Sequence, residues 1–237
     1  MDNAFPYFAH GKYKALVIGA HGALGAAFVD AFSSDLQCAY VEPVSRGSGS
    51  GFDLADEASI RAQANLSSAT GPYDIIIDST GALTIEGVGP EKSLQSLHAE
   101  HLKKAFLINT IGPALVLRYF SPLLAKGASV YGKLSARVGS IGDNKKGGWY
   151  GYRGSKAALN MILHTAALEL QRKNPDLRVV ALQPGTVRSA LSQGFTSSST
   201  HLLEPSASVS GMLQAMKSLG VKSGAHFVDY KGTEIPW

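Results

Sequence analysis

Hydrophobic positions along the chain form short apolar runs that alternate with longer segments of helical periodicity. The runs have the length and composition of strands buried in a parallel sheet. They lie at 14–18, 38–44, 73–78, 128–134, 177–183 and 225–230. Helices are predicted at 26–32, 55–67, 152–171 and 212–219, and the segment 91–118 is either two helices or one long helix that Pro113 breaks.

Alternating strands and helices indicate right-handed βαβ units. The pattern therefore predicts a Rossmann-like, doubly wound parallel sheet in a three-layer α/β/α arrangement, with 1–237 as a single domain. We expect 1–12 to be an N-terminal extension. We expect 190–210 to be a loop or short helices over the substrate pocket, because long connections in such domains often serve as lids.

Composition narrows the class of protein. Hydrophobic residues make up 45% and charged residues 17% of the 237 positions, which is typical of a globular chain with a core. The net charge is only +4 and the cations are dispersed, so nucleic acid is not an expected partner. Cys38 is alone, which excludes an intramolecular disulfide and favours the cytoplasm. We expect neither a secretory signal nor a membrane span, and no metal site.

A glycine-rich turn, Gly19-Ala20-His21-Gly22-Ala23-Leu24-Gly25, follows the first strand and opens the first helix. Glycines at such a turn let backbone N–H groups approach a pyrophosphate, and the helix N-terminus favours negative charge. The spacing differs from the commonest dinucleotide fingerprint. An ordinary strand-to-helix turn is the alternative, since the chain has 26 glycines.

The end of the second strand bears on the choice of dinucleotide. An acidic residue there binds a ribose hydroxyl, whereas an arginine suits a 2′-phosphate. Glu42 is followed by Pro43-Val44 and can lie within the strand, while Ser45-Arg46 comes just after it. We therefore favour NADP, bound by Ser45 and Arg46 with His21 adding positive character, over NAD bound by Glu42.

The stretch WYGYRGSK at 149–156 contains a candidate acid/base pair. Only Tyr152 of its two tyrosines has a lysine four positions later, on the same helix face. A neighbouring ammonium favours the phenolate, so Lys156 is predicted to lower the pKa of Tyr152. The pair alone is weak evidence, because nine tyrosines and many lysines produce such spacings by chance.

Several motifs now stand in a familiar order: the glycine turn, Asn109 in mid-chain, Ser135, Tyr152-x-x-x-Lys156 and Pro184-Gly185. In this the chain resembles the short-chain dehydrogenase/reductase family over nearly its whole length. Three stretches resemble the C-factor-like, or sniffer-like, branch of that family: SARVGSIGDN at 135–144, GGWYGYRGSKAALN at 147–160, and the ending at 232–237.

The resemblance implies catalytic roles. Tyr152 looks like the acid/base, and Lys156 looks like the residue that lowers its pKa and binds the nicotinamide ribose. Asn109 looks like the asparagine that holds a water in a proton relay; otherwise it is an interior polar residue bonded to backbone. Ser135 takes the place of the serine that polarises the substrate carbonyl.

The resemblance also implies cofactor contacts beyond the glycine turn. Asp53-Leu54 resembles the pair whose acid contacts the adenine, although Asp53 would equally cap the following helix. Ser79-Thr80-Gly81 stands where the family usually has Asn-Ala-Gly. The segment 184–189 resembles the one that closes over the nicotinamide, with contacts expected from Pro184, Gly185, Val187 and Ser189.

The serine position departs from the family pattern, which usually reads Ser-Ser where this chain has Ser135-Ala136. One step along a strand turns a side chain to the other face. We favour Ser135, since backbone past the strand end is freer, and keep Ser140 as the alternative.

The predicted function is an NADP-dependent interconversion of a carbonyl and a secondary alcohol on a small molecule. Trp149, Tyr150 and Phe195 are expected to line the substrate pocket or else to pack in the core. The resemblance implies a homodimer or homotetramer. A dinucleotide-binding regulatory protein with little turnover is the alternative, and a sugar-nucleotide epimerase is disfavoured by the short chain after Pro184.

Overall fold

The computed structural model describes residues 5–8, 11–46, 51–188 and 202–237. Its centre is a parallel sheet with the strand order β2-β1-β3-β4-β5-β6. The strands are β1 (Tyr13–Ile18), β2 (Cys38–Val44), β3 (Ile75–Asp78), β4 (Ser129–Leu134), β5 (Leu177–Gln183) and β6 (His226–Asp229). The predicted doubly wound sheet is confirmed.

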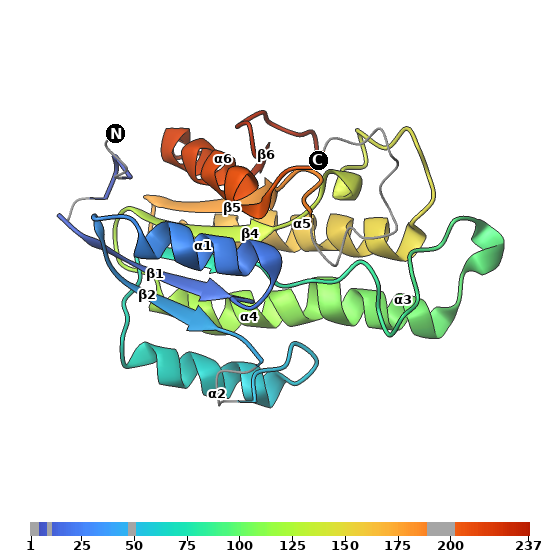
Figure 1. Cartoon of the computed structure of the whole chain (residues 1–237), viewed down its shortest axis with the longest axis horizontal. Coiled ribbons are helices and arrows are strands. Elements are labelled where there is room, and N and C mark those ends of the chain that lie inside the picture. The colour runs from blue at the N-terminus through green and yellow to red at the C-terminus, as the bar shows by residue number, and fades with distance from the viewer. Residues whose placement is uncertain (1–4, 9–10, 47–50, 189–201) are drawn as a thin grey trace.

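Helices cover both faces of this sheet (Figure 1). On one face lie α1 (Ala23–Ser33) and α6 (Pro205–Ser218), which pack on the core around Phe28 and Met212. The other face carries α2 (Glu57–Ser68), α4 (Gly112–Phe120) and α5 (Tyr150–Leu170). Side chains alternate along each strand, so the central strands β1, β3, β4 and β5 supply both cores and are almost entirely buried, whereas the edge strand β2 is partly exposed.

Helical structure runs from α3 (Ala99–Phe106) through a π-helical turn (Leu107–Ile111) into α4. The predicted break at Pro113 is wrong. The N–H of Gly112 bonds the carbonyl of Leu107, five residues earlier. Proline is tolerated in the first turn of a helix, where its missing N–H costs little, and Pro113 occupies that position in α4.

The last helix begins earlier than its apolar periodicity predicted. Pro205 starts α6, so the end of the segment 190–210, predicted to be a loop or short helices, is helical from 205 onward. The serine-rich sequence of its first turns carries little hydrophobic signal, yet Ser208 is buried and donates a hydrogen bond of 2.6 Å to the carbonyl of Pro184. The start of α6 thus combines the buried apolar side chain of Val209 with a polar contact of Ser208 that a hydrophobicity pattern does not reveal.

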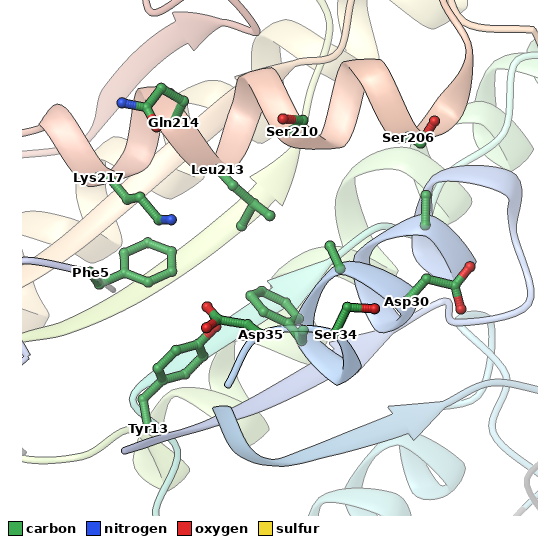
Figure 2. A pocket seen from close by; sticks show the side chains of 13 residues that line it. Phe5, Tyr13, Asp30, Ser34, Asp35, Ser206, Ser210, Leu213, Gln214 and Lys217 are labelled. Atoms are coloured by element: carbon green, nitrogen blue, oxygen red, sulfur yellow. The ribbon is translucent and has the colours of Figure 1, made fainter. Parts of the chain in front are cut away.

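The described part of the N-terminal extension packs beside α6. Phe5 is buried, and the hydroxyl of Tyr7 donates to the carbonyl of Met216. A hollow of about 390 Å³ lies between this segment, α1 and α6, where Lys217 reaches over the ring of Phe5 (Figure 2). None of the helices in the described ranges combines the length and the apolar character needed to cross a bilayer.

Candidate active site

A cavity that bears on the predicted chemistry lies at the carboxyl ends of β1 and β3. The chain turns outward in opposite directions from these neighbouring strands, which is where open α/β sheets bind ligands. The cavity has a volume of about 550 Å³. Its walls include many residues predicted to bind the cofactor: Gly19, His21, Gly22, Ser45, Arg46, Asp53, Leu54, Ser79, Thr80 and Gly81.

The glycine turn fits tightly against the strand ends. Gly19 has a φ of 85°, and its N–H bonds the carbonyl of Val44 at the end of β2. A methyl group on Gly25 would lie only 2.1 Å from the carbonyl oxygen of Gly19. Ala23 and Leu24 begin α1, and Leu24 packs against the core beneath. Only glycine permits this close approach, so the turn is more constrained than an ordinary connection.

Replacing Gly25 with alanine is expected to lower the free energy of unfolding by about 1–3 kcal/mol, because backbone atoms must move to admit the methyl group. The Ser79 hydroxyl, 2.8 Å from the same methyl position, adds to the clash. Chemical denaturation measures the change. Gly220→Ala is the matched control, since its methyl group would enter open space. Equal stability of the two variants would contradict the tight turn.

The two candidate contacts to the cofactor ribose, Glu42 and Arg46, differ in position. Glu42 lies within β2, and its carboxylate accepts hydrogen bonds from Ser67 and Tyr73, away from the cavity. Arg46 is exposed on the cavity wall, and the Ser45 hydroxyl lies 3.1 Å from Nδ1 of His21. The structure therefore brings Ser45, Arg46 and His21 together and does not bring Glu42 with them.

Asp53 lies on the cavity wall but does not cap α2. The cap is Asp56, whose carboxylate accepts from the N–H of Ala58. Asp53 instead accepts from the N–H of Ala55, and its own N–H bonds the Ser59 hydroxyl. The expectation of a capping role for Asp53 is wrong, because the helix begins two residues later than the sequence pattern predicted. Leu54 packs under the same wall.

Tyr152 and Lys156 lie one turn apart on α5. The Lys156 ammonium is 5.7 Å from the centre of the Tyr152 ring and donates a hydrogen bond of 3.2 Å to the carbonyl of Leu134, at the end of β4. Lys156 is buried, at 3% exposure. The helix thus places the lysine against the strand end that borders the predicted reaction site.

Burial governs the ionisation of both residues. It raises the pKa of Tyr152 to about 12, so the lowering predicted from the sequence does not appear. Burial, with a smaller contribution from the nearby Lys133, lowers the pKa of Lys156 to about 7, while Asp78 opposes this change. The prediction considered only the attraction between the two groups, whereas the low dielectric around them disfavours both charged forms.

Asn109 lies in the π-helical turn and is fully buried. Its amide accepts from the N–H of Ala82 at 2.9 Å and donates to the carbonyl of the same residue at 2.8 Å. A methyl group on Gly81 would lie 3.0 Å from Asn109 Oδ1 and 3.3 Å from Lys156 Nζ. Asn109 therefore binds backbone and holds the segment after β3 beside Lys156.

Neither candidate serine is free of internal contacts. The Ser135 hydroxyl donates a hydrogen bond of 2.6 Å to Oδ1 of Asn160, one turn beyond Lys156 on α5. The Ser140 hydroxyl donates to the carbonyl of Pro236 and accepts from the N–H of Asp143. Ser135 thus lies just past the end of β4, beside α5, whereas Ser140 ties the C-terminal segment to the loop after β4.

The aromatic residues before Tyr152 differ in position. The Trp149 ring contacts the Tyr152 ring edge-on, at 6.2 Å between centres. Tyr150 is 37% exposed. Buried Glu91 receives the N–H groups of Trp149 and Gly151, on its backbone carbonyl and its carboxylate respectively, and so fixes the start of α5. Phe195 and Ser189 lie outside the described residues.

The segment after β5 turns back toward the start of α6. Gly185 has a φ of 79°, and Val187 pairs with Leu203 in a parallel bridge. The N–H of Leu203 bonds the carbonyl of Thr186. Pro184 and Gly185 therefore begin an anchored turn, but neither they nor Val187 belong to the walls of the described cavity.

Sequence reasoning missed two groups of residues. Cavity-wall residues from the connection after β3 carry no motif: Ala82, Thr84, Ile85 and Glu86, with Ile108 and Phe52 opposite. The second group is a buried ion pair, Lys133 and Asp78, with 2.8 Å between Nζ and Oδ1. The signal that could have revealed this ion pair is the charged residue near the end of each of two apolar strands.

Comparison with known proteins identifies similar chains. Residues 13–199 match the family model for short chain dehydrogenases. The chain is 31% identical over 188 residues to 1-hydroxy-2-glutathionyl-2-methyl-3-butene dehydrogenase from Rhodococcus sp. (strain AD45), covering 79% of each chain. It is 32% identical over 169 residues to C-signal from Myxococcus xanthus, covering 71% of this chain and 95% of that protein.

Solved structures with the same fold include carbonyl reductases. The NADPH-bound carbonyl reductase from chicken fatty liver superposes with a TM-score of 0.80 at 22% identity, covering 96% of this chain and all of that one. Carbonyl reductase Sniffer of D. melanogaster gives a TM-score of 0.79 at 20% identity over 95% of this chain and all of its own. At this identity the likeness concerns the fold.

Proposed function

The chain belongs to the short chain dehydrogenase family, a family of oxidoreductases, and from that premise we propose that it is an NADPH-dependent carbonyl reductase. The observation that carries the proposal is the joining of two sites at one sheet edge. The cavity formed by the glycine turn reaches Gly81, and Gly81 adjoins the buried ammonium of Lys156. The cavity proposed to bind the dinucleotide therefore lies next to the proposed acid/base pair, Tyr152 and Lys156.

The cavity residues fit a dinucleotide with a 2′-phosphate. The glycine turn offers backbone N–H groups and a helix N-terminus for the pyrophosphate. Ser45 and Arg46 stand where the adenosine ribose is expected, and Glu42 is engaged elsewhere. Similarity in fold to reductases with bound NADP or NADPH supports the same choice.

The chemistry assigned to the chain is proton transfer and orientation. NADPH, when bound, supplies the hydride. Tyr152 holds its proton at neutral pH, since burial raises the pKa of its phenol to about 12, and it can therefore donate that proton to a carbonyl oxygen. Lys156 in its charged form stabilises the phenolate left behind. Ser135 adds a hydroxyl near the carbonyl if it turns from Asn160.

Binding of the cofactor is tested by calorimetric titration with NADPH and, separately, with NADH. We expect NADPH to bind more tightly. Arg46→Ala is expected to weaken NADPH binding about 10- to 100-fold, as for loss of a charged hydrogen bond, and to leave NADH binding nearly unchanged. Arg172→Ala, an exposed arginine after α5, is the control.

The titration also has outcomes that count against the proposal. Tight binding of NADH alone would reject the assignment of Arg46 to a 2′-phosphate. Binding of neither nucleotide by the wild-type chain would reject the reductase itself. If NADPH binds, aldehydes, ketones and quinones are the substrate classes to screen for oxidation of the cofactor.

A dinucleotide-binding regulatory protein is the second candidate. The observation in its favour is the serine region: Ser135 is bonded to Asn160, and Ala136 follows where the family usually has a second serine. The similarity to C-signal supports the same idea. Tight NADPH binding without turnover of any carbonyl class would favour this candidate over the reductase.

A further inference from the structure

Asp78 and Lys133 stand directly opposite each other at the carboxyl ends of two neighbouring strands. The register of β3 and β4 pairs Asp78 with Lys133, as it pairs Ile76 with Tyr131 two residues earlier. Ile76 and Tyr131 belong to the core beneath α2, α4 and α5. Since strand side chains alternate, the charged pair points to the same face as that core.

The charged pair is almost completely buried and holds one loop residue firmly. The Lys133 ammonium donates to Asp78 Oδ1 at 2.8 Å, to the carbonyl of Thr80 at 2.7 Å and to Thr80 Oγ1 at 3.0 Å. An ammonium has three hydrogens, so its donors are all used. Asp78 Oδ1 also accepts from the N–H of Thr80 at 2.9 Å. Thr80 is therefore fixed through its backbone and its side chain.

The fixed residue borders the catalytic groups. Gly81 adjoins both Lys156 and Asn109, and Ala82 is bonded through its N–H and carbonyl to Asn109. The segment 80–82 is thus held from one side by Lys133 and from the other by Asn109. Lys156 also bonds the carbonyl of Leu134, the residue after Lys133. Lys133 and Lys156 therefore both lie at the carboxyl end of β4.

A buried ion pair is costly to desolvate and is seldom the most stable choice for a core. Its location beside Lys156, within a site that tunes ionisation, calls for a functional explanation. We propose that Lys133 and Asp78 are positioning residues of the active site, which fix segment 80–82 and set the balance of charge around the Lys156 ammonium. The catalytic meaning of this pair rests on the proposed function, but the balance of charge can be measured without cofactor or substrate.

The other charged groups near Lys156 make the direction of each effect clear. Lys133 on β4 lowers the pKa of Lys156, and Asp78 on β3 raises it, while the phenol of Tyr152 on α5 is neutral at the relevant pH. Removing Lys133 therefore raises the pKa of Lys156, and removing Asp78 lowers it. A purely structural role for the pair would not produce shifts of opposite sign.

The test is NMR titration of the protein carrying ¹⁵N,¹³C-labelled lysine, with the Lys156 signal assigned by its loss in Lys156→Arg. Relative to wild type, Lys133→Gln is expected to move the Lys156 midpoint upward, and Asp78→Asn to move it downward, each by about one pH unit. The control, Lys222→Gln with Glu234→Gln, neutralises an exposed ion pair in the same way and is expected to leave the midpoint unchanged. Midpoints that stay fixed, or that move in the same direction, would overturn the proposal.

Single variants leave one buried charge without its partner and can fail to fold. The double variant Asp78→Asn with Lys133→Gln leaves no unpaired charge at this buried pair. It replaces the single variants in the test if they do not fold. We expect it to fold, to show a smaller shift of the Lys156 midpoint than either single variant, since the two removed charges act in opposite directions, and to bind NADPH about tenfold more weakly as segment 80–82 loosens. Unchanged NADPH affinity in the double variant overturns the proposal. Failure of the wild type to bind NADPH would reject the proposed function and leave the midpoint test valid.

Discussion

Tyr152→Phe is expected to reduce carbonyl turnover by about 10²- to 10⁴-fold while leaving NADPH affinity nearly unchanged. The substitution removes only the phenolic hydroxyl. The ring keeps its edge contact with Trp149 and its position 5.7 Å from the Lys156 ammonium, so the helix and cofactor cavity keep their shape. Steady-state oxidation of NADPH measures turnover, and calorimetric titration measures binding.

A matched control separates the loss of this hydroxyl from the loss of any tyrosine hydroxyl. Tyr40 on β2 is 44% exposed and remote from the cavity, so Tyr40→Phe is expected to retain wild-type turnover. Wild-type turnover in Tyr152→Phe would contradict the assignment of Tyr152 as the acid. Loss of NADPH binding in that variant would instead indicate a structural role for the hydroxyl.

The strands of the fold could be predicted from the sequence because each strand is marked by a local run of apolar residues. Apolar runs buried on both faces have almost no alternative to a central parallel sheet. The predicted range 177–183 and the buried strand β5 agree, and 38–44 also agrees with β2, although this edge strand is partly exposed. Helix boundaries were less predictable. Pro205 marks the early start of α6 locally, but the bond from Ser208 to Pro184, 24 positions earlier, is a contact that no local pattern specifies.

The tight glycine turn beside the cavity was also predictable, since it depends on glycines in a continuous stretch of sequence. The ionisation of Tyr152 and Lys156 was not. The spacing of Tyr152 and Lys156 indicates that they are neighbours but says nothing of how deeply they are buried, and burial decides the pKa of each. Likewise, the pairing of Asp78 with Lys133 depends on strand register across 55 positions of sequence, which no local pattern specifies.

If Lys156 binds the cofactor as proposed, its low pKa is expected to make cofactor binding depend on pH near neutrality. At pH below about 7 the side chain is charged, and above it is neutral. A ribose-binding role and a nearby anionic cofactor both favour the charged form. NADPH affinity is therefore expected to fall with rising pH above about 7, by at most about tenfold per pH unit, with uptake of up to about one proton per molecule bound. Calorimetry in buffers of different ionisation enthalpy measures that uptake.

Lys156→Met provides the decisive comparison. Methionine fills much of the same volume without a charge, so the variant is expected to fold, to lose turnover by about 10²-fold or more, and to bind NADPH with no proton uptake near neutral pH. The sign for stability follows from the same ionisation. Because an unfolded chain holds the Lys156 proton up to about pH 10, the wild type gains stability relative to the variant as pH rises from about 7 to 10. Proton uptake that persists in Lys156→Met would assign the titration to another group and would contradict the role given to this lysine.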